Sequence, residues 1–224
     1  LAQDAKDIIL QNRNERENGN MDESTFSGKT SKIAASLGVE FTRTHLVEND
    51  VLTAFDRGAI YQHDFSSYHL GSHNCTTLDL EALLANGLKI KNGGTRQPKS
   101  IRVALAQTYL LIGAVSQNQF GGVSVTAIDT CLAPYLKRTF DDKFVEICNI
   151  LEIDLPELST HWSILDDSLS TLPRKAQEIS RAYALDDLSQ GMKGFFHDLS
   201  GSSSREGSQL SFSSINYGND TNPD

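Results

Sequence analysis

The segment PKSIRVALAQTYLLIGAVSQNQFGG, residues 98–122, constrains the fold more than any other part of the sequence. Ser100 is a residue type that caps helices, and Gly121 and Gly122 close the run. Between them, apolar residues recur at helical spacing and form a wide stripe that must be buried. The sequence therefore predicts a long amphipathic helix that packs on other elements. The stripe consists of Ile101, Ala104, Leu105, Ile112 and Val115.

Helical spacing recurs along most of the chain, with short strand candidates between the helices. Because short strands between long helices are typical of α/β proteins, we expect an α/β fold, although neither half of the chain looks able to close a sheet alone. The predicted helices are residues 1–11, a segment from Ser24 through Phe41, a segment capped by Asn49 or Asp50 and ended by Gly58, a segment opened by Thr77 or Asp79 and closed by Gly87, and residues 131–153 and 173–199. The strand candidates are AIYQHDF at 59–65, VSVTAID at 123–129 and LSFSSINY at 210–217. The segment 12–24 is expected to be a polar loop, and the remaining Ser/Gly/Asn-rich tail a loop or a disordered end.

Charge and cysteine usage exclude several classes of protein. The net charge is −9 and the sequence has no basic block, so nucleic acid is not an expected partner. No apolar run is long enough to span a bilayer, and the N-terminus lacks the apolar core of a signal peptide. Cys75, Cys131 and Cys148 are odd in number and widely spaced, which argues against a disulfide scaffold and predicts a cytoplasmic protein.

The stretch YQHDFSSYHLGSHNCTTLDLE at 61–81 brings His, Asp and Cys side chains close together in sequence. A structural zinc site usually needs four ligands with at least two cysteines, and only Cys75 is present here. A cysteine just before a capped helix also suits a redox role in a polar pocket. A polar loop around a small buried cysteine is the plain alternative. From the residues alone, all three interpretations stay open.

The sequence SGKT at 27–30 has the last residues of a phosphate-binding loop. That loop requires a glycine five residues before Gly28, and Glu23 stands there with no strand before it. We therefore do not expect a phosphate loop at this position.

Seven segments, in order and at similar spacing, resemble the anaerobic (class III) ribonucleoside-triphosphate reductases. They are NGNMDESTFSGKTSKIA, IYQHDF, HNCTTLDLEALLANGLKIKNG, QPKSIRVAL, VSQNQFGGVSV, DTCLAPYLKRTF and SFSSINYGNDTNPD. The resemblance covers nearly the whole chain and is weakest from about 141 to 190.

The resemblance implies an α/β fold, a helix-rich part of the ten-stranded α/β barrel of glycyl-radical enzymes and ribonucleotide reductases, incomplete in this chain. It divides the sequence into N-terminal helices at 1–58, first barrel strands with effector and dimer helices at 59–140, a helical segment at 141–199, and a strand and loop end at 200–224.

In that family a glycyl radical generates a thiyl radical on one cysteine, which abstracts the 3′ hydrogen of the ribose. A second cysteine, on the first barrel strand, faces the 2′ carbon and takes part in the reduction. Cys75, in HNC, falls on that second cysteine, so the resemblance favours the redox interpretation over a metal ligand. His63 and Asp64 fall on the family's HD and, with Asn74, are expected to bind substrate.

The resemblance also places the subunit contact and the effector-nucleotide site around the helix from Ser100 and the YLKR segment. Lys137 and Arg138 are candidates to bind effector phosphates. The alternative interpretation, given equal weight, is that both are ordinary solvated charges on a helix surface.

The sequence ends at Asp224, before the family's thiyl-radical loop, its glycyl-radical loop and its four-cysteine zinc site. We expect no cofactor and no metal ligand in this chain. A glycyl radical, installed by a radical S-adenosylmethionine activating protein with an iron–sulfur cluster, and zinc are expected on the missing C-terminal part. Asp198, Gly201 and Ser202 also depart from the family's residues, which weakens the expected polar lining there.

Two classes of function follow. The first is a fragment or split subunit of the reductase, converting ribonucleoside triphosphates to deoxyribonucleoside triphosphates and inactive without the missing part. It would act with dNTP and ATP effectors, as a homodimer or with a C-terminal half. The alternative is a non-catalytic dNTP- or ATP-binding or dimerisation module, or a truncated, degenerate relative.

Overall fold

The computed structural model describes residues 2–10, 24–71, 73–87, 89–90, 93–156, 162, 164–202, 209–218 and 220–221. The chain divides into two compact units. The first consists of residues 1–76, 113–123 and 202–212, and the second of residues 77–112, 124–201 and 213–224. Most of the loop predicted at 12–24, and part of the tail predicted as loop or disordered, lie outside the described residues.

The first unit begins with helices at the positions that the sequence predicts. Besides its α-helices it contains one short π-helix, η1, and one short 3-10 helix, η2. Its elements are α1 (Ala2–Leu10), α2 (Phe26–Phe41), η1 (Thr42–Leu46), α3 (Asn49–Asp56) and η2 (Phe65–Leu70).

The fully buried residues of α2 are small: Gly28, Ser31 and Gly38. The helix is capped by Thr25, whose Oγ1 accepts a hydrogen bond of 3.0 Å from the Gly28 backbone N–H. Gly38 is buried against η2, where an added Cβ would lie 2.2 Å from the Ser66 carbonyl oxygen. In contrast, the apolar residues Leu37 and Phe41 of the same helix are each 48% exposed.

The strand predicted at 59–65 is also wrong. These residues form turns, and η2 begins at Phe65. Asp64 adopts a left-handed backbone conformation with φ of 54°, which aspartate tolerates better than most residues and which ends any extended run. The Phe65 ring then stacks on the Phe55 ring of α3 at a centroid distance of 4.8 Å.

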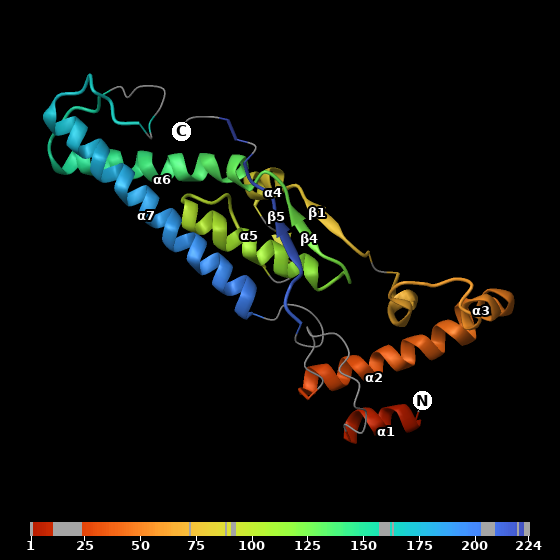
Figure 1. The fold of residues 1–224 in the computed structure, drawn as a ribbon. Helices are drawn as coiled ribbons and strands as arrows, with labels where there is room; N and C mark the ends of the chain where they lie inside the picture. Colours follow the sequence, from red (N-terminus) through yellow and green to blue (C-terminus); the bar gives the residue numbers. More distant parts are fainter. Residues whose placement is uncertain are drawn as a thin grey trace. The chain divides into compact units, whose positions relative to one another are not determined.

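The other elements lie wholly or mostly in the second unit (Figure 1). They are β1 (Thr76–Leu78), α4 (Leu80–Asn86), β2 (Lys89–Ile90), β3 (Gly93–Gly94), α5 (Ile101–Ser116), β4 (Val123–Val125), α6 (Ile128–Ile150), α7 (Thr171–Gly201) and β5 (Ser213–Ile215). The first residue of β1, the first residue of β4 and the last four residues of α5 are assigned to the first unit.

The strands β1, β4 and β5 form one sheet in that order, and β2 pairs with β3 in an antiparallel ribbon. Between β4 and β5, the Val123 N–H donates to Phe212 O at 2.8 Å, and the Asn216 N–H donates to Val125 O at 2.9 Å. The residue numbers of the paired residues rise together in the two strands, from Val123 and Phe212 to Val125 and Asn216, which is the pattern of parallel pairing. The strands predicted near 123–129 and 210–217 are therefore confirmed, although each is only three residues long.

The caps expected from the sequence hold at α4 and α5. The Asp79 carboxylate accepts from the Ala82 N–H at 3.1 Å, which settles the choice between Thr77 and Asp79. The Ser100 hydroxyl accepts from the Val103 N–H at 3.4 Å. α5 ends at Ser116, before Gly121, because residues 117–122 turn back toward β4.

One hydrophobic cluster of the second unit lies between α6 and α7. The Phe140 ring is completely buried and packs against the Trp162 ring in a tilted arrangement, at a centroid distance of 4.7 Å. Gln177 on α7 is also completely buried. Its Oε1 accepts from the Asp166 N–H at 2.8 Å, and its Nε2 donates to Ile164 O at 2.9 Å. This one side chain therefore fixes the connection between the two helices. The other buried residues of this cluster are Phe144, Ile147, Cys148, Ala176 and Ala184. Further buried apolar residues of the unit lie on α4, α5 and β4, among them Leu80, Leu84, Ile101, Ala104, Leu105, Ile112 and Val125.

The tail returns to the start of α6. The Asp129 carboxylate, in the first turn of that helix, accepts from the Gly218 N–H at 2.6 Å and from the Asp220 N–H at 3.2 Å. None of the described helices is both long and apolar enough to cross a membrane.

Candidate functional site

Cys75 lies in an extended segment that pairs with the backbone before β4. The Phe120 N–H donates to His73 O at 3.1 Å, and the Thr76 N–H donates to Gly122 O at 3.0 Å. The pairing is parallel, as the bridge between His73 and Gln119 also indicates. Cys75 therefore occupies a defined position beside a parallel strand, directly before β1.

The Cys75 side chain is exposed, whereas the other two thiols are more covered. Its Sγ is 3.8 Å from Asn74 Oδ1, so the structure brings these two predicted site residues together. Cys148 is completely buried in the core between α6 and α7, and Cys131 is half-buried. Burial raises the pKa of both of these thiols, which keeps them protonated and poorly reactive. Cys75 is therefore the most accessible of the three thiols.

His63 and Asp64 form a pair of their own. The distance from His63 Nδ1 to Asp64 Oδ2 is 2.5 Å, and the Asp64 carbonyl oxygen accepts from the Ser67 N–H at 2.9 Å. Both residues therefore stand at the start of η2. Within the described part of the chain, no hydrogen bond or ion pair links this pair to Asn74 or Cys75.

Lys137 and Arg138 lie on the exposed surface of α6 and pair with carboxylates one turn further along. The distance from Lys137 Nζ to Asp141 Oδ2 is 2.6 Å, and that from Arg138 Nε to Asp142 Oδ2 is 4.0 Å. Neither side chain lines the pocket described next.

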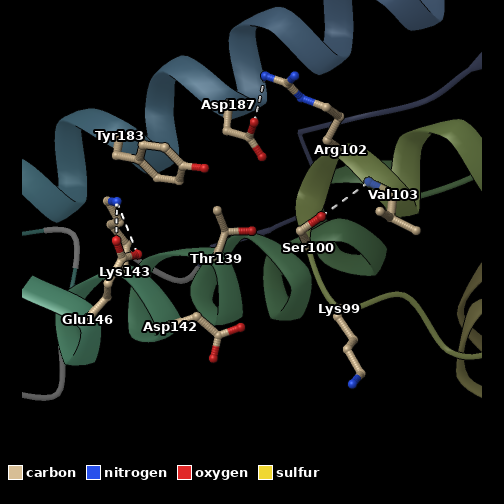
Figure 2. Close-up of a pocket in the computed structure, with 10 residues that line it drawn as sticks. All are labelled: Lys99, Ser100, Arg102, Val103, Thr139, Asp142, Lys143, Glu146, Tyr183 and Asp187. Carbon is tan, nitrogen blue, oxygen red and sulfur yellow. Dashed lines mark hydrogen bonds and ion pairs between the residues drawn. The ribbon is translucent and has the colours of Figure 1, made fainter.

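A pocket of about 380 Å³ lies within the second unit, where the start of α5 meets α6 and α7 (Figure 2). The Ile101 N–H donates to the buried Thr139 hydroxyl at 2.9 Å, which joins the first turn of α5 to α6 and forms one wall. The lining residues are Lys99, Ser100, Arg102, Val103, Thr139, Asp142, Lys143, Glu146, Tyr183 and Asp187.

The pocket carries charges of both signs. Lys143 Nζ is 3.0 Å from Glu146 Oε1 and 4.8 Å from the centroid of the Tyr183 ring. Arg102 is paired with Asp187, whereas no hydrogen bond or ion pair joins the Lys99 ammonium group to any residue that the structure describes. The Lys143 ammonium group lies beside the Tyr183 ring, whereas the Lys99 side chain points away from both (Figure 2). An ammonium group next to an aromatic ring suits a ligand with an anionic part and a planar part.

Lys99 and Lys143 are not among the residues that the sequence pattern predicts for a site. The signals that could have found them are modest: Lys99 directly precedes the helix cap Ser100, and Thr139, Lys143 and Glu146 recur at helical spacing on one face of α6. What the sequence could not supply is the approach of Tyr183 from α7.

The described residues contain no group of three or more His, Cys, Asp or Glu side chains that could hold a metal ion. The SGKT sequence lies in the first turns of α2, a helix that begins at Phe26.

Comparison with known proteins assigns the family. The family model described as anaerobic ribonucleoside-triphosphate reductase matches residues 17–224. Three curated proteins named anaerobic ribonucleoside-triphosphate reductase are similar to the chain. The protein of Salmonella typhimurium is 31% identical over 144 residues, which are 63% of this chain and 20% of the relative. That of Escherichia coli is 32% identical over 126 residues, which are 56% and 18% of the two chains. That of Enterobacteria phage T4 is 33% identical over 125 residues, which are 55% and 20% of the two chains.

The aligned part therefore spans about a fifth of the length of these relatives. The family match includes both the Cys75 segment and the pocket between α5, α6 and α7. The chain belongs to the anaerobic ribonucleoside-triphosphate reductase family.

Proposed function

We propose that this chain is the part of an anaerobic ribonucleoside-triphosphate reductase that supplies the reductive cysteine, Cys75. The observation that carries the proposal is the position of an exposed thiol beside a parallel strand, directly before β1, in a chain of this family. The parallel pairing of the small sheet supports the further proposal that these strands belong to the family's ten-stranded barrel.

The reaction replaces the 2′ hydroxyl of a ribonucleoside triphosphate by hydrogen and releases that oxygen as water. Cys75 gives one hydrogen atom from its thiol to the substrate, a one-electron step that leaves a sulfur-centred radical. A formate-type or thioredoxin-type reductant supplies two electrons in all: one, with a proton, restores the thiol, and the other completes the reduction of the substrate as water leaves. The glycyl radical supplies hydrogen abstraction when the complete reductase is assembled. His63, Asp64 and Asn74 are proposed to bind the substrate by hydrogen bonds, with the Asp64 carboxylate as an acceptor for a substrate hydroxyl.

Zinc and the glycyl radical are proposed for a part of the reductase other than these residues. A four-cysteine zinc site does not fit this sequence, because it has only three cysteines. Two of them, Cys131 and Cys148, are also partly or fully buried and lie far from Cys75 in the sequence. The partners proposed are a radical S-adenosylmethionine activating protein and a second copy of the chain or a C-terminal half.

The test uses the anaerobic protein that contains this sequence, purified from its native source with everything bound to it. Conversion of a labelled ribonucleoside triphosphate to the deoxy product is measured for the unchanged protein and for Cys75→Ser. We expect the serine variant to lose conversion to the detection limit, while Cys131→Ser keeps it. Retained conversion in Cys75→Ser would contradict the proposal.

A second candidate function rests on the pocket of the second unit. The pocket has Lys143 beside the Tyr183 ring, and Lys99 also lines it, which supports the proposal that it binds a dNTP or ATP effector. A non-catalytic nucleotide-binding module would need this pocket and not Cys75. Lys137 and Arg138 stay an alternative proposal for effector phosphates, on the exposed surface of α6 outside this pocket.

Isothermal titration with dATP, dGTP, dTTP and ATP tests this function. We expect Lys99→Gln and Lys143→Gln to weaken binding of one or more of them by at least about tenfold, since each removes a charge-assisted contact. Lys193→Gln, on an exposed face of α7 that does not line the pocket, serves as the control. Equal loss in Lys137→Gln would place the phosphates on the exposed face of α6 instead. Binding that survives all of these changes would reject both assignments.

A further inference from the structure

Gly121 lies against the thiol of Cys75. If a Cβ atom were added to Gly121, it would lie 2.4 Å from Cys75 Sγ, far inside van der Waals contact. The same atom would lie 2.1 Å from the Asn74 carbonyl oxygen. Gly121 does not have a positive φ, so the backbone conformation there suits any residue and only the space demands glycine.

The backbone contacts on either side of Gly121 explain why the approach is so close. The Phe120 N–H and the Gly122 carbonyl oxygen bind the segment of Cys75 on either side of that residue, as described above. Gly121, between them, therefore faces the Cys75 side chain across the strand pair. A side chain at this position would push the sulfur away or separate the two strands.

We propose that Gly121 is a positioning residue for Cys75: its missing side chain lets the sulfur rest on the neighbouring strand and fixes where the thiol hydrogen is presented. The inference rests on the proposed function of Cys75 for its role in reduction, whereas the contact itself does not depend on that function. Gly122, next in sequence, faces Phe212 and does not contact the thiol.

The test compares three proteins: the unchanged chain, the Gly121→Ala variant and the Gly93→Ala variant. Gly93 is the matched control because it also lacks a positive φ and has nothing within 4 Å of an added Cβ. The rate of alkylation by iodoacetamide is measured separately at each cysteine by peptide mass spectrometry. Cys131 and Cys148 are internal references, since loosening of the whole fold would raise the rate at the buried Cys148.

We expect Gly121→Ala to accelerate alkylation at Cys75 by about threefold or more, because the displaced sulfur is more accessible. The rates at Cys131 and Cys148 should stay unchanged, and Gly93→Ala should change none of the three. A Cys75 rate equal to that of the unchanged chain would overturn the proposal.

If Gly121→Ala does not fold, the contact is measured in folded protein by ¹H–¹⁵N NMR of Cys75→Ser. Replacing the sulfur should shift the Gly121 amide signal clearly and leave the Gly93 signal in place. Equal, negligible shifts would overturn the proposal. In the assembled reductase, Gly121→Ala should lower kcat with KM unchanged. If Cys75→Ser keeps full activity while the alkylation and NMR results hold, the proposed function fails and the contact stands.

Discussion

Arg102 on α5 and Asp187 on α7 form an ion pair whose two side chains differ strongly in exposure. The distance from Nη2 to Oδ1 is 2.7 Å, and the side chains are 58% exposed for the arginine and 11% for the aspartate. The carboxylate has given up most of its water, whereas the guanidinium has kept much of its own. Removing one partner therefore has a different consequence from removing the other.

We predict that Arg102→Ala lowers the free energy of unfolding by about 1–3 kcal/mol, because it leaves a nearly buried carboxylate without a partner. Asp187→Ala should cost less, since the remaining arginine can reach water, and the double variant should recover part of the loss of Arg102→Ala. Urea unfolding of the four proteins measures the coupling. Additive costs would show that the pair contributes no interaction energy.

Gly38 should be intolerant of alanine although it lies in a helix. A Cβ there would lie 2.2 Å from Ser66 O and 2.4 Å from His69 Cε1, so Gly38→Ala must separate α2 from η2. We expect a loss of about 1–3 kcal/mol, measured as faster amide exchange in residues 26–46 and 65–70.

Gly194 on α7 is the control, since nothing lies within 4 Å of an added Cβ. Gly194→Ala should stabilise by about 0.5–1 kcal/mol through helix propensity. If the two substitutions have the same effect, the packing of Gly38 against η2 is not tight in solution.

Gln177→Leu should release the connection between α6 and α7. The leucine removes the acceptor for Asp166 N–H and the donor for Ile164 O, and leaves those backbone groups without these partners. Trp162 is the only tryptophan of the chain and packs against Phe140, so its fluorescence reports on this connection directly.

We expect red-shifted emission, easier quenching by iodide and a loss of about 2–4 kcal/mol from several broken hydrogen bonds. Gln190→Leu, at an exposed position of the same helix, should leave the emission unchanged. An unshifted spectrum in Gln177→Leu would show that apolar packing alone holds Trp162.

Burial of Cys148 gives the protein an alkaline pH dependence. The pKa of this thiol is raised above its ordinary value of 9.0, so the folded chain keeps a proton that the unfolded chain releases. Its contribution to stability is therefore complete below pH 9.0 and is lost as the pH rises through the folded pKa.

Denaturant unfolding at pH values on both sides of 9.0 should show that Cys148→Ala loses less stability with rising pH than the unchanged chain. Ile147→Val, in the same core without a titrating group, should follow the unchanged chain. Parallel curves for all three proteins would rule out the thiol as the source.

Local signals in the sequence were sufficient for the helices and their caps. Ser100 and Asp79 cap α5 and α4 because a short polar side chain binds the free N–H groups of the first turn, a property of a few neighbouring residues. The burial of α2 was not predictable in the same way. Its apolar stripe is exposed at Leu37 and Phe41, and the close approach at Gly38 depends on η2, nearly thirty residues further along.

In the candidate site, too, contacts between sequence neighbours could be predicted and contacts between distant segments could not. Cys75 and Asn74 are neighbours in sequence and are brought together, as expected. The strand predicted across His63 and Asp64 failed because one left-handed residue ends the extended conformation, and no periodicity reports this. Gly121 was interpreted as a helix end, and its contact with Cys75 comes from pairing across more than forty residues. Three-dimensional neighbours of this kind leave no local pattern.

The hydrogen bonds from the Gly218 and Asp220 N–H groups to the Asp129 carboxylate have a consequence for the order in which the chain folds. The carboxylate and the Gly218 N–H are 89 residues apart, and the Ser214 and Ser124 hydroxyls that join β5 to β4 are 90 residues apart. Closing a loop of that length costs conformational entropy before any contact is gained. The connection between α6 and α7, from Ile150 to Thr171, is much shorter, so the two helices can meet at a lower entropic cost. We infer that the helical hairpin forms early and that β5 docks last, so the edge of β4 stays open during most of folding and is the place where a nascent chain is most prone to aggregate.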